Sequence, residues 1–193
     1  MATNLSNLAN FLNPEIDIEE KKISGVYEYP ITPEQIRIKA IEHGISIHPL
    51  NIKKVAEKIF GMKICEEDLG KSVSGFLERI GENWCIYVNK YESDLRKKFT
   101  IAHELGHFIL HKDKIIAQGA STPDQIFFRN DDNNSVEQEA NNFASELLMP
   151  KDEFIKVIKN GCNTLEKLSE YFGLSTSAVR YRAYKLGIIS EYA

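Results

Sequence analysis

The stretch His103-Glu104-Leu105-Gly106-His107 decides the fold, because it lies inside a segment of helical periodicity, residues 94–110. On a helix, residues four apart lie on one face about 6 Å apart along the axis, so His103 and His107 can converge on one ion. Glu104 lies one position further on, where it can face a metal-bound water instead of the metal. Two His ligands and a general-base Glu form the arrangement of a metallohydrolase, so the pattern predicts that chemistry.

A catalytic zinc site needs a third protein ligand, which must come from elsewhere in the chain. His111 is too far away, because it lies about 12 Å from His103 on a continuous helix, whereas two ligands of one ion lie about 3.5 Å apart. We interpret His111 as a cation at the helix C-terminus or as a group that hydrogen-bonds to a ligand. His43 and His48 flank a helix end and a proline turn, and we interpret them as surface residues.

Glu137 is the stronger candidate for the third ligand. Asn141 follows it by four residues, so both can face the first helix, as a ligand and its hydrogen-bonding partner. Glu139 is expected to point elsewhere on the same helix, and Glu146 lies two turns away. For each of these acids the alternative is a solvated helix face. Two His and one carboxylate suit Zn²⁺ best but also accept Mn²⁺, Fe²⁺ or Co²⁺.

Length and composition bound the class of protein. The chain has 193 residues and 22.0 kDa, enough for one good-sized core with a small appendage. Its 42% hydrophobic and 27% charged residues are globular composition, without the roughly 20-residue apolar run of a membrane span. Three cysteines and no signal-peptide pattern predict a reduced, cytoplasmic protein. The net charge of −4 argues against a protein that coats nucleic acid.

Periodicity and capping signals predict the elements around the central helix. Further helices are expected at residues 32–43, 51–60, 135–149 and 152–159, with capping boxes at Thr32/Gln35 and Ser135/Gln138. Short β-rich runs predict a small antiparallel sheet, at residues 62–66, 75–80 and 84–89. Residues 112–134 are expected to form a long polar loop, such as a lid. The chain is therefore predicted to have a mostly helical α+β fold.

Residues 163–187 carry a helix-turn-helix signature, with a turn at Gly173. The outward face of the second helix presents Arg180, Tyr181 and Lys185, which are candidate contacts for nucleic acid or a partner protein. The segment has only a small positive charge, too little for strong DNA binding by a monomer. We therefore favour a structural unit that packs beside the core and helps to recognise a protein substrate. DNA binding is the alternative.

Two ordered motifs resemble the ImmA/IrrE family of bacterial and phage metallopeptidases. They are residues 99–111, around the two histidines, and residues 137–150, from Glu137 to Pro150. Weaker similarity spans residues 33–187, and none covers residues 1–30. The resemblance implies a zincin-like core in which Glu137, of a Glu-x-x-x-Asn motif, is the third ligand. It also implies a protein substrate, because relatives cleave helix-turn-helix repressors that are often encoded beside them.

The sequence thus predicts a loosely ordered arm at residues 1–30, a zincin-like metallopeptidase domain at 31–160 and a helix-turn-helix-like segment at 161–193. The predicted function is zinc-dependent endopeptidase cleavage of a helix-turn-helix repressor or a similar regulatory protein. In this hypothesis His103, His107 and Glu137 bind the metal, and Glu104 deprotonates water. The alternative is a non-catalytic regulatory protein that binds DNA or a partner protein through its C-terminal segment.

Overall fold

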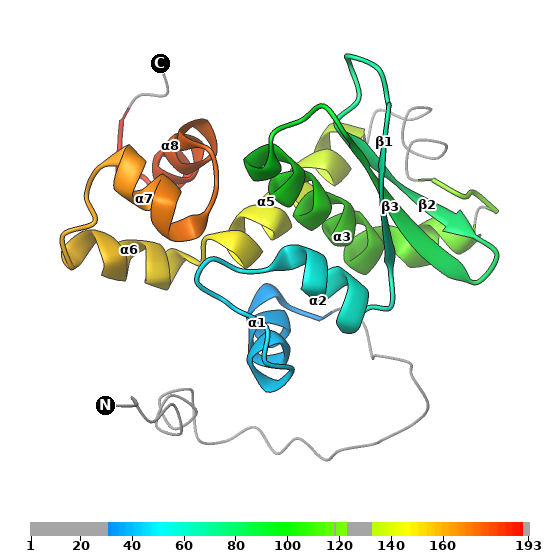
Figure 1. Cartoon of the computed structure of the whole chain (residues 1–193), viewed down its shortest axis with the longest axis horizontal. Helices are drawn as coiled ribbons and strands as arrows, with labels where there is room; N and C mark the ends of the chain where they lie inside the picture. The colour runs from blue at the N-terminus through cyan, green and yellow to red at the C-terminus, as the bar shows by residue number, and fades with distance from the viewer. Residues whose placement is uncertain (1–30, 118, 123–132, 191–193) are drawn as a thin grey trace.

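The computed structural model describes residues 31–117, 119–122 and 133–190 (Figure 1). The helices of this part are α1 (Pro33–Glu42), α2 (Ile52–Lys58), α3 (Asp94–Ala117), α5 (Asn133–Leu148), α6 (Lys151–Lys159), α7 (Leu165–Phe172) and α8 (Thr176–Lys185). The strands are β1 (Lys63–Glu67), β2 (Gly75–Ile80) and β3 (Asn83–Asn89). The predicted α+β class is confirmed, and so is the predicted C-terminal helix pair.

Helices α3 and α5 lie side by side at the centre of the molecule, with the sheet on one side and α7 and α8 on the other (Figure 1). The apolar face of α3 is buried along most of its length, from Thr100 to Ile115. Gly106 permits the close approach of α5, because a Cβ atom there would lie 3.2 Å from the carbonyl oxygen of Ala140. The two helices are therefore close enough for side chains on α3 to contact side chains on α5.

The sheet is mixed, so the prediction of an antiparallel sheet was wrong for one of its two strand pairs. Its strand order is β1-β3-β2, with β2 antiparallel and β1 parallel to β3. A two-residue turn joins β2 to β3, but residues 68–74 between β1 and β2 cross the end of β3. That crossing spans about 10 Å, which seven residues cover easily. Periodicity reports which residues are in strands, but not the direction in which they pair.

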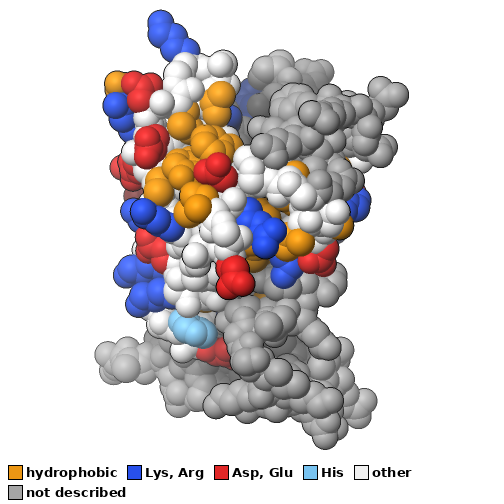
Figure 2. Space-filling model, turned by 90° about the vertical axis from the view of Figure 1, so that its right-hand side faces the viewer, with side chains coloured by type: hydrophobic (Ala, Val, Ile, Leu, Met, Phe, Trp, Pro, Cys, Tyr) orange, Lys and Arg blue, Asp and Glu red, His pale blue; other side chains and the backbone are white. Residues whose placement is uncertain are grey.

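The sheet contacts α3 closely at Gly75. A Cβ atom at this position would lie 2.4 Å from Cγ2 of Thr100, so only glycine fits. On the opposite face of the sheet, Phe76 and Tyr87 stack with ring centroids 4.6 Å apart. Figure 2 views the molecule from the side of the sheet and shows hydrophobic side chains gathered among charged ones.

Several predicted boundaries change in the structure. Helix α3 continues to Ala117 because Ile115 extends its buried face, so the polar loop begins later than predicted. Helix α5 begins at Asn133, two residues before the predicted cap at Ser135. The capping box predicted at Thr32 is confirmed. The predicted arm and residues 123–132 of the predicted loop lie outside the described residues.

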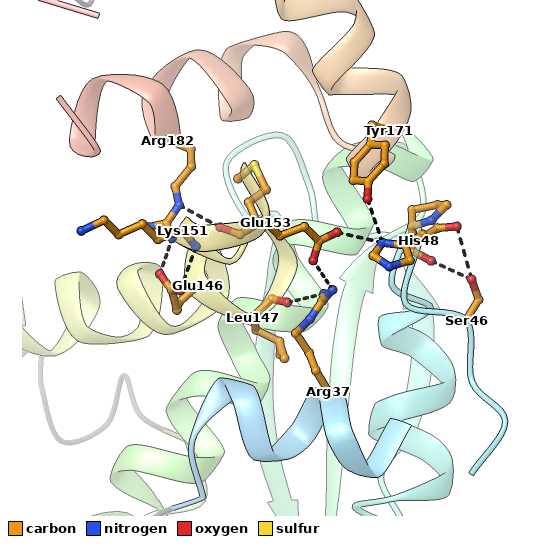
Figure 3. A network of polar contacts seen from close by, with 11 residues as sticks. Arg37, Ser46, His48, Glu146, Leu147, Lys151, Glu153, Tyr171 and Arg182 are labelled. Atoms are coloured by element: carbon orange, nitrogen blue, oxygen red, sulfur yellow. Dashed lines mark hydrogen bonds and ion pairs between the residues drawn. The ribbon is translucent and has the colours of Figure 1, made fainter. Parts of the chain in front are cut away.

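Two buried arginines hold the C-terminal end of α5 (Figure 3). Arg37 of α1 donates a hydrogen bond to the carbonyl of Leu147 (3.2 Å), and Arg182 of α8 donates one to that of Met149 (3.0 Å). The last carbonyls of a helix have no partner within the helix, and positive charge is favourable there. Arg37 also pairs with Glu153 of α6 at 2.5 Å, and Arg182 pairs with Glu146 of α5.

The contacts of α7 continue this network. Nδ1 of His48 lies 2.8 Å from Oε1 of Glu153 and 3.3 Å from the hydroxyl of Tyr171 (Figure 3). His48 was interpreted as a surface residue, and its side chain is in fact 48% exposed while linking α6 to α7. Phe154 of α6 and Phe172 of α7 also stack, with ring centroids 5.4 Å apart. One hydrophobic core includes side chains from before and after residue 161, so the division there stays a prediction.

Among the described residues, no helix combines the length and the apolar character that crossing a membrane requires. The cytoplasmic location stays a prediction.

Replacing Arg182 tests the link between α8 and α5. Arg182→Met should lower the free energy of unfolding by about 1–3 kcal/mol, because the Met149 carbonyl and the Glu146 carboxylate lose their partner. Lys185→Met, an exposed change on the same helix, should stay within about 0.5 kcal/mol of the wild type. Chemical denaturation measures both values. Equal effects of the two changes would contradict the role given to Arg182.

Tyr171 predicts a loss of stability at high pH. Burial and the nearby charge of Glu153 raise the pKa of Tyr171 to about 12. The folded protein therefore holds the phenolic proton more tightly than the unfolded chain, and this contribution is complete below pH 10 and lost between about pH 10 and 12. Denaturation across that range should show a smaller decline for Tyr171→Phe than for the wild type. Tyr184→Phe, an exposed change on α8, should retain the wild-type decline.

Candidate metal centre

Three side chains from α3 and α5 converge at the centre of the molecule. The Nε2 atoms of His103 and His107 lie 3.0 Å apart. Oε2 of Glu137 lies 3.3 Å from Nε2 of His103, and Oε1 of Glu137 lies 3.1 Å from Nε2 of His107. Helix α3 positions the two imidazoles one turn apart, and the first turns of α5 bring the carboxylate opposite them.

These separations fit a tetrahedral metal site. Zinc binds His nitrogen and carboxylate oxygen at about 2.0–2.2 Å, so two ligand atoms of one tetrahedral ion lie about 3.3–3.5 Å apart. The three observed separations, 3.0–3.3 Å, are close to that value. Three protein ligands also leave one position open, as in catalytic zinc sites. The donor set and its spacing therefore suit a divalent ion.

Hydrogen bonds orient both imidazoles for this task. Nδ1 of His103 lies 3.0 Å from Oδ1 of Asn141, an acceptor, so Nδ1 of His103 carries the proton. Nδ1 of His107 lies 3.2 Å from Nδ1 of His111, and Nε2 of His111 lies 3.0 Å from Oε2 of Glu139. One set of protons satisfies this chain: His107 donates to His111, which donates to Glu139. Both Nε2 lone pairs then face Glu137.

The charge of the cluster favours a cation. Burial lowers the pKa of His111, which keeps this ring neutral and able to accept from His107. Burial opposes the charging of His103, but hydrogen bonding to Glu137 and the charge of Glu104 leave its pKa raised. When His103 and His107 carry protons on Nε2, their hydrogen bonds hold the pKa of Glu137 well below its usual range, and a bound metal ion would replace those protons. Two imidazole lone pairs 3.0 Å apart beside a carboxylate need positive charge between them, which a divalent ion supplies.

The cluster opens onto a hollow of about 260 Å³. Glu104, which is only 6% exposed, lines this hollow together with His103 and Glu137. Arg96 and Thr100, from the preceding turns of α3, line it as well. A substrate in the hollow would therefore meet two of the three predicted ligands, His103 and Glu137, together with the predicted general base.

The structure places most predicted site residues as expected. Asn141 contacts His103, and His111 contacts a predicted ligand but lies within α3 instead of at its end. Glu139 was expected to point elsewhere, yet it contacts His111. The four-residue spacing from His107 to His111 could have predicted this contact, because it places His111 on the same face of α3 as the two predicted ligands. The roles of these residues stay predictions.

The candidate contacts on α8 lie away from the metal cluster. Tyr181 is 39% exposed, and Nζ of Lys185 lies 6.0 Å from the centroid of its ring. Arg180 is partly buried. Tyr181 also lines a second hollow, next to the first. The role of all three in binding stays a prediction.

The fold and the site define an α+β protein with a His-His-Glu cluster that suits a divalent metal. The model of the IrrE N-terminal-like domain, Peptidase M78, matches residues 57–184, which is more than half of the chain and includes every residue of the cluster. The chain belongs to this family of ImmA/IrrE metallopeptidase-like proteins.

A curated relative agrees with this assignment, and a solved structure shares the fold. Metallopeptidase ImmA of Bacillus subtilis (strain 168) is 27% identical over 137 residues, which are 66% of this chain and 72% of the relative. A Mycobacterium tuberculosis transcriptional regulator of known structure matches 79% of this chain with a TM-score of 0.55 and 17% identity. This chain spans 46% of the regulator's length, and a likeness at that identity shows the fold alone.

Replacing His111 tests the chain of hydrogen bonds behind the cluster. His111→Phe should weaken Zn²⁺ binding by about 10–100-fold, because His107 loses the partner that orients its ring. Glu139→Gln should have a smaller effect in the same direction, since an amide oxygen can still accept from His111. Competition with a chelator of known affinity measures both. His43→Phe, an exposed control on α1's cap, should bind like the wild type, and unchanged affinity in His111→Phe would contradict the role of His111.

Proposed function

We propose that this protein is a zinc-dependent endopeptidase in which His103, His107 and Glu137 hold the ion and Glu104 is the general base. The observation that supports it best is the spacing of the three ligand atoms at 3.0–3.3 Å, beside a hollow that Glu104 also lines. Membership of a metallopeptidase family supports the same chemistry. Zn²⁺ is the metal we propose, and Mn²⁺ and other divalent ions are the alternatives that the same ligands accept.

The side chains of the site divide the work of peptide hydrolysis. When bound, the divalent ion supplies Lewis-acid activation of water and of the scissile carbonyl. The Glu104 carboxylate takes a proton from the attacking water and passes it to the leaving amine. Asn141 and His111 hold the two imidazoles in fixed orientations, so the lone pairs that bind the ion are in place before the substrate arrives.

The proposed substrate is a regulatory protein, specifically a helix-turn-helix repressor encoded nearby. The support is the resemblance of residues 99–111 and 137–150 to the ImmA/IrrE motifs, together with the family match. We propose that the scissile segment of this substrate binds in the hollow of about 260 Å³ beside the cluster. The competing function is a non-catalytic regulator that binds DNA through α7 and α8, and a gel shift with operator DNA of the neighbouring gene separates the two.

The decisive variant is Glu104→Gln. Loss of the general base should reduce cleavage by about 10²–10⁴-fold, whereas Zn²⁺ binding should persist because the ligands are intact. The assay incubates the purified protein with the repressor encoded beside its gene, with and without chelator, and follows the fragments by mass spectrometry.

A matched control keeps this result specific. Glu139→Gln changes a nearby acid on α5 that does not line the hollow, and it should retain far more activity than Glu104→Gln. Cleavage by Glu104→Gln at the wild-type rate would rule out the proposed mechanism, and cleavage that survives removal of the metal would rule out metal dependence.

A further inference from the structure

A second hollow of about 230 Å³ adjoins the one beside the metal cluster. Arg96 and Phe99 of α3 and Asn141 of α5 line both hollows. The two hollows are therefore parts of one cleft, and a chain that occupies the first can continue into the second.

The two central helices set the direction of this cleft. From His103, one helical turn toward the start of α3 reaches Phe99, and a second turn reaches Leu95. From Glu137, one turn toward the end of α5 reaches Asn141, and a second reaches Ser145. The residues two turns away, Leu95 and Ser145, line the second hollow only. The cleft thus runs from the cluster for about 12 Å along both helices.

Helix α8 closes the far end of the cleft. Ser175, Ala178 and Tyr181, from the first turns of α8 and its N-cap, line the second hollow. Nζ of Lys98 donates a hydrogen bond to the carbonyl of Gly173 (3.3 Å), in the turn between the two helices. Together with Arg182, which binds the end of α5, this contact fixes α8 against both central helices.

The lining of the second hollow suits a large apolar side chain. Leu95 is 37% and Tyr181 is 39% exposed, and Phe99 and Ala178 are partly buried beside them. Apolar side chains that remain accessible in a concave site are typical of binding surfaces. The serine hydroxyls of the lining can bond to the backbone of a bound peptide, and Arg96 at the junction is the charged group of this lining.

We propose that the second hollow is the substrate subsite for a large apolar side chain, and that Tyr181 determines this specificity. An extended peptide advances about 3.3 Å per residue, so a cleft of about 12 Å places this side chain about two to four residues from the scissile bond. The proposal rests on the proposed peptidase function. It also gives the start of α8 a use other than DNA binding, for which helix-turn-helix proteins employ the corresponding residues.

The test measures cleavage preference in peptide libraries. The Zn²⁺-loaded protein of 193 residues is incubated with mixtures in which each position near the cut site is varied, and the products are read by mass spectrometry. The wild type should prefer a large apolar residue at one position two to four residues from the cut. Tyr181→Ala should lower kcat/KM for those peptides by about tenfold and leave peptides with glycine there within about twofold.

Two further variants make the test specific. Tyr184→Ala removes an equally exposed tyrosine from α8 that does not line the hollow, and its preference should match the wild type. Ser177→Trp places a large ring at the rim of the hollow and should shift the preference toward small side chains. Thermal unfolding shows that each variant is folded.

The outcomes separate this inference from the proposed function. If the wild type cleaves peptides and Tyr181→Ala keeps its preference, the subsite is wrong while the peptidase function stands. An equal change in Tyr184→Ala would also overturn the role of Tyr181. If the Zn²⁺-loaded wild type cleaves no peptide and α8 instead binds operator DNA, both the proposed function and the subsite fail.

Discussion

The close packing of α3 against α5 is the constraint on which the rest of the site depends. Two ligands lie on one helix and the third on the other, so the predicted site exists only if the helices approach closely. Gly106 allows this, since the Ala140 carbonyl lies where a larger side chain at position 106 would go. Because position 106 has no side chain, α5 lies closer to α3, and Glu137 can reach the two imidazoles.

Polar side chains buried between two helices need hydrogen-bonding partners. His111 is 1% exposed and His107 is 2% exposed, and an unpaired polar group at that depth is destabilising. The chain from His107 through His111 to Glu139 solves this problem, because it ends on a carboxylate at the surface. The same bonds that satisfy the buried rings also decide which nitrogen of each ring faces the cluster. Stability and metal-ligand geometry are therefore provided by the same contacts.

The sequence predicted the parts of this arrangement that depend on local periodicity. The four-residue spacing of His103 and His107 needs only a helix, and the capping box at Thr32 needs only one turn. Contacts between distant segments were harder to predict: the spacing from Glu137 to Asn141 favoured Glu137 over the other acids and the resemblance to a family strengthened that choice, but the contact of Glu139 with His111 was missed. Strand direction was missed for the same reason, since the parallel pairing of β1 depends on a crossing that no local pattern reports.

The position of α8 follows from how the end of α5 is held. A helix leaves its last carbonyls unpaired, and here Arg37 and Arg182 supply the missing donors from two other helices. Arg182 can reach the end of α5 only if the inner face of α8 lies against α5. In this position the first turn of α8 lines the second hollow, next to the metal cluster. A helix pair whose pattern is typical of DNA-binding proteins is thereby placed as one wall of the cleft. The requirement to cap a central helix, more than the surface charge of α8, explains why Tyr181 lies within reach of whatever occupies that cleft.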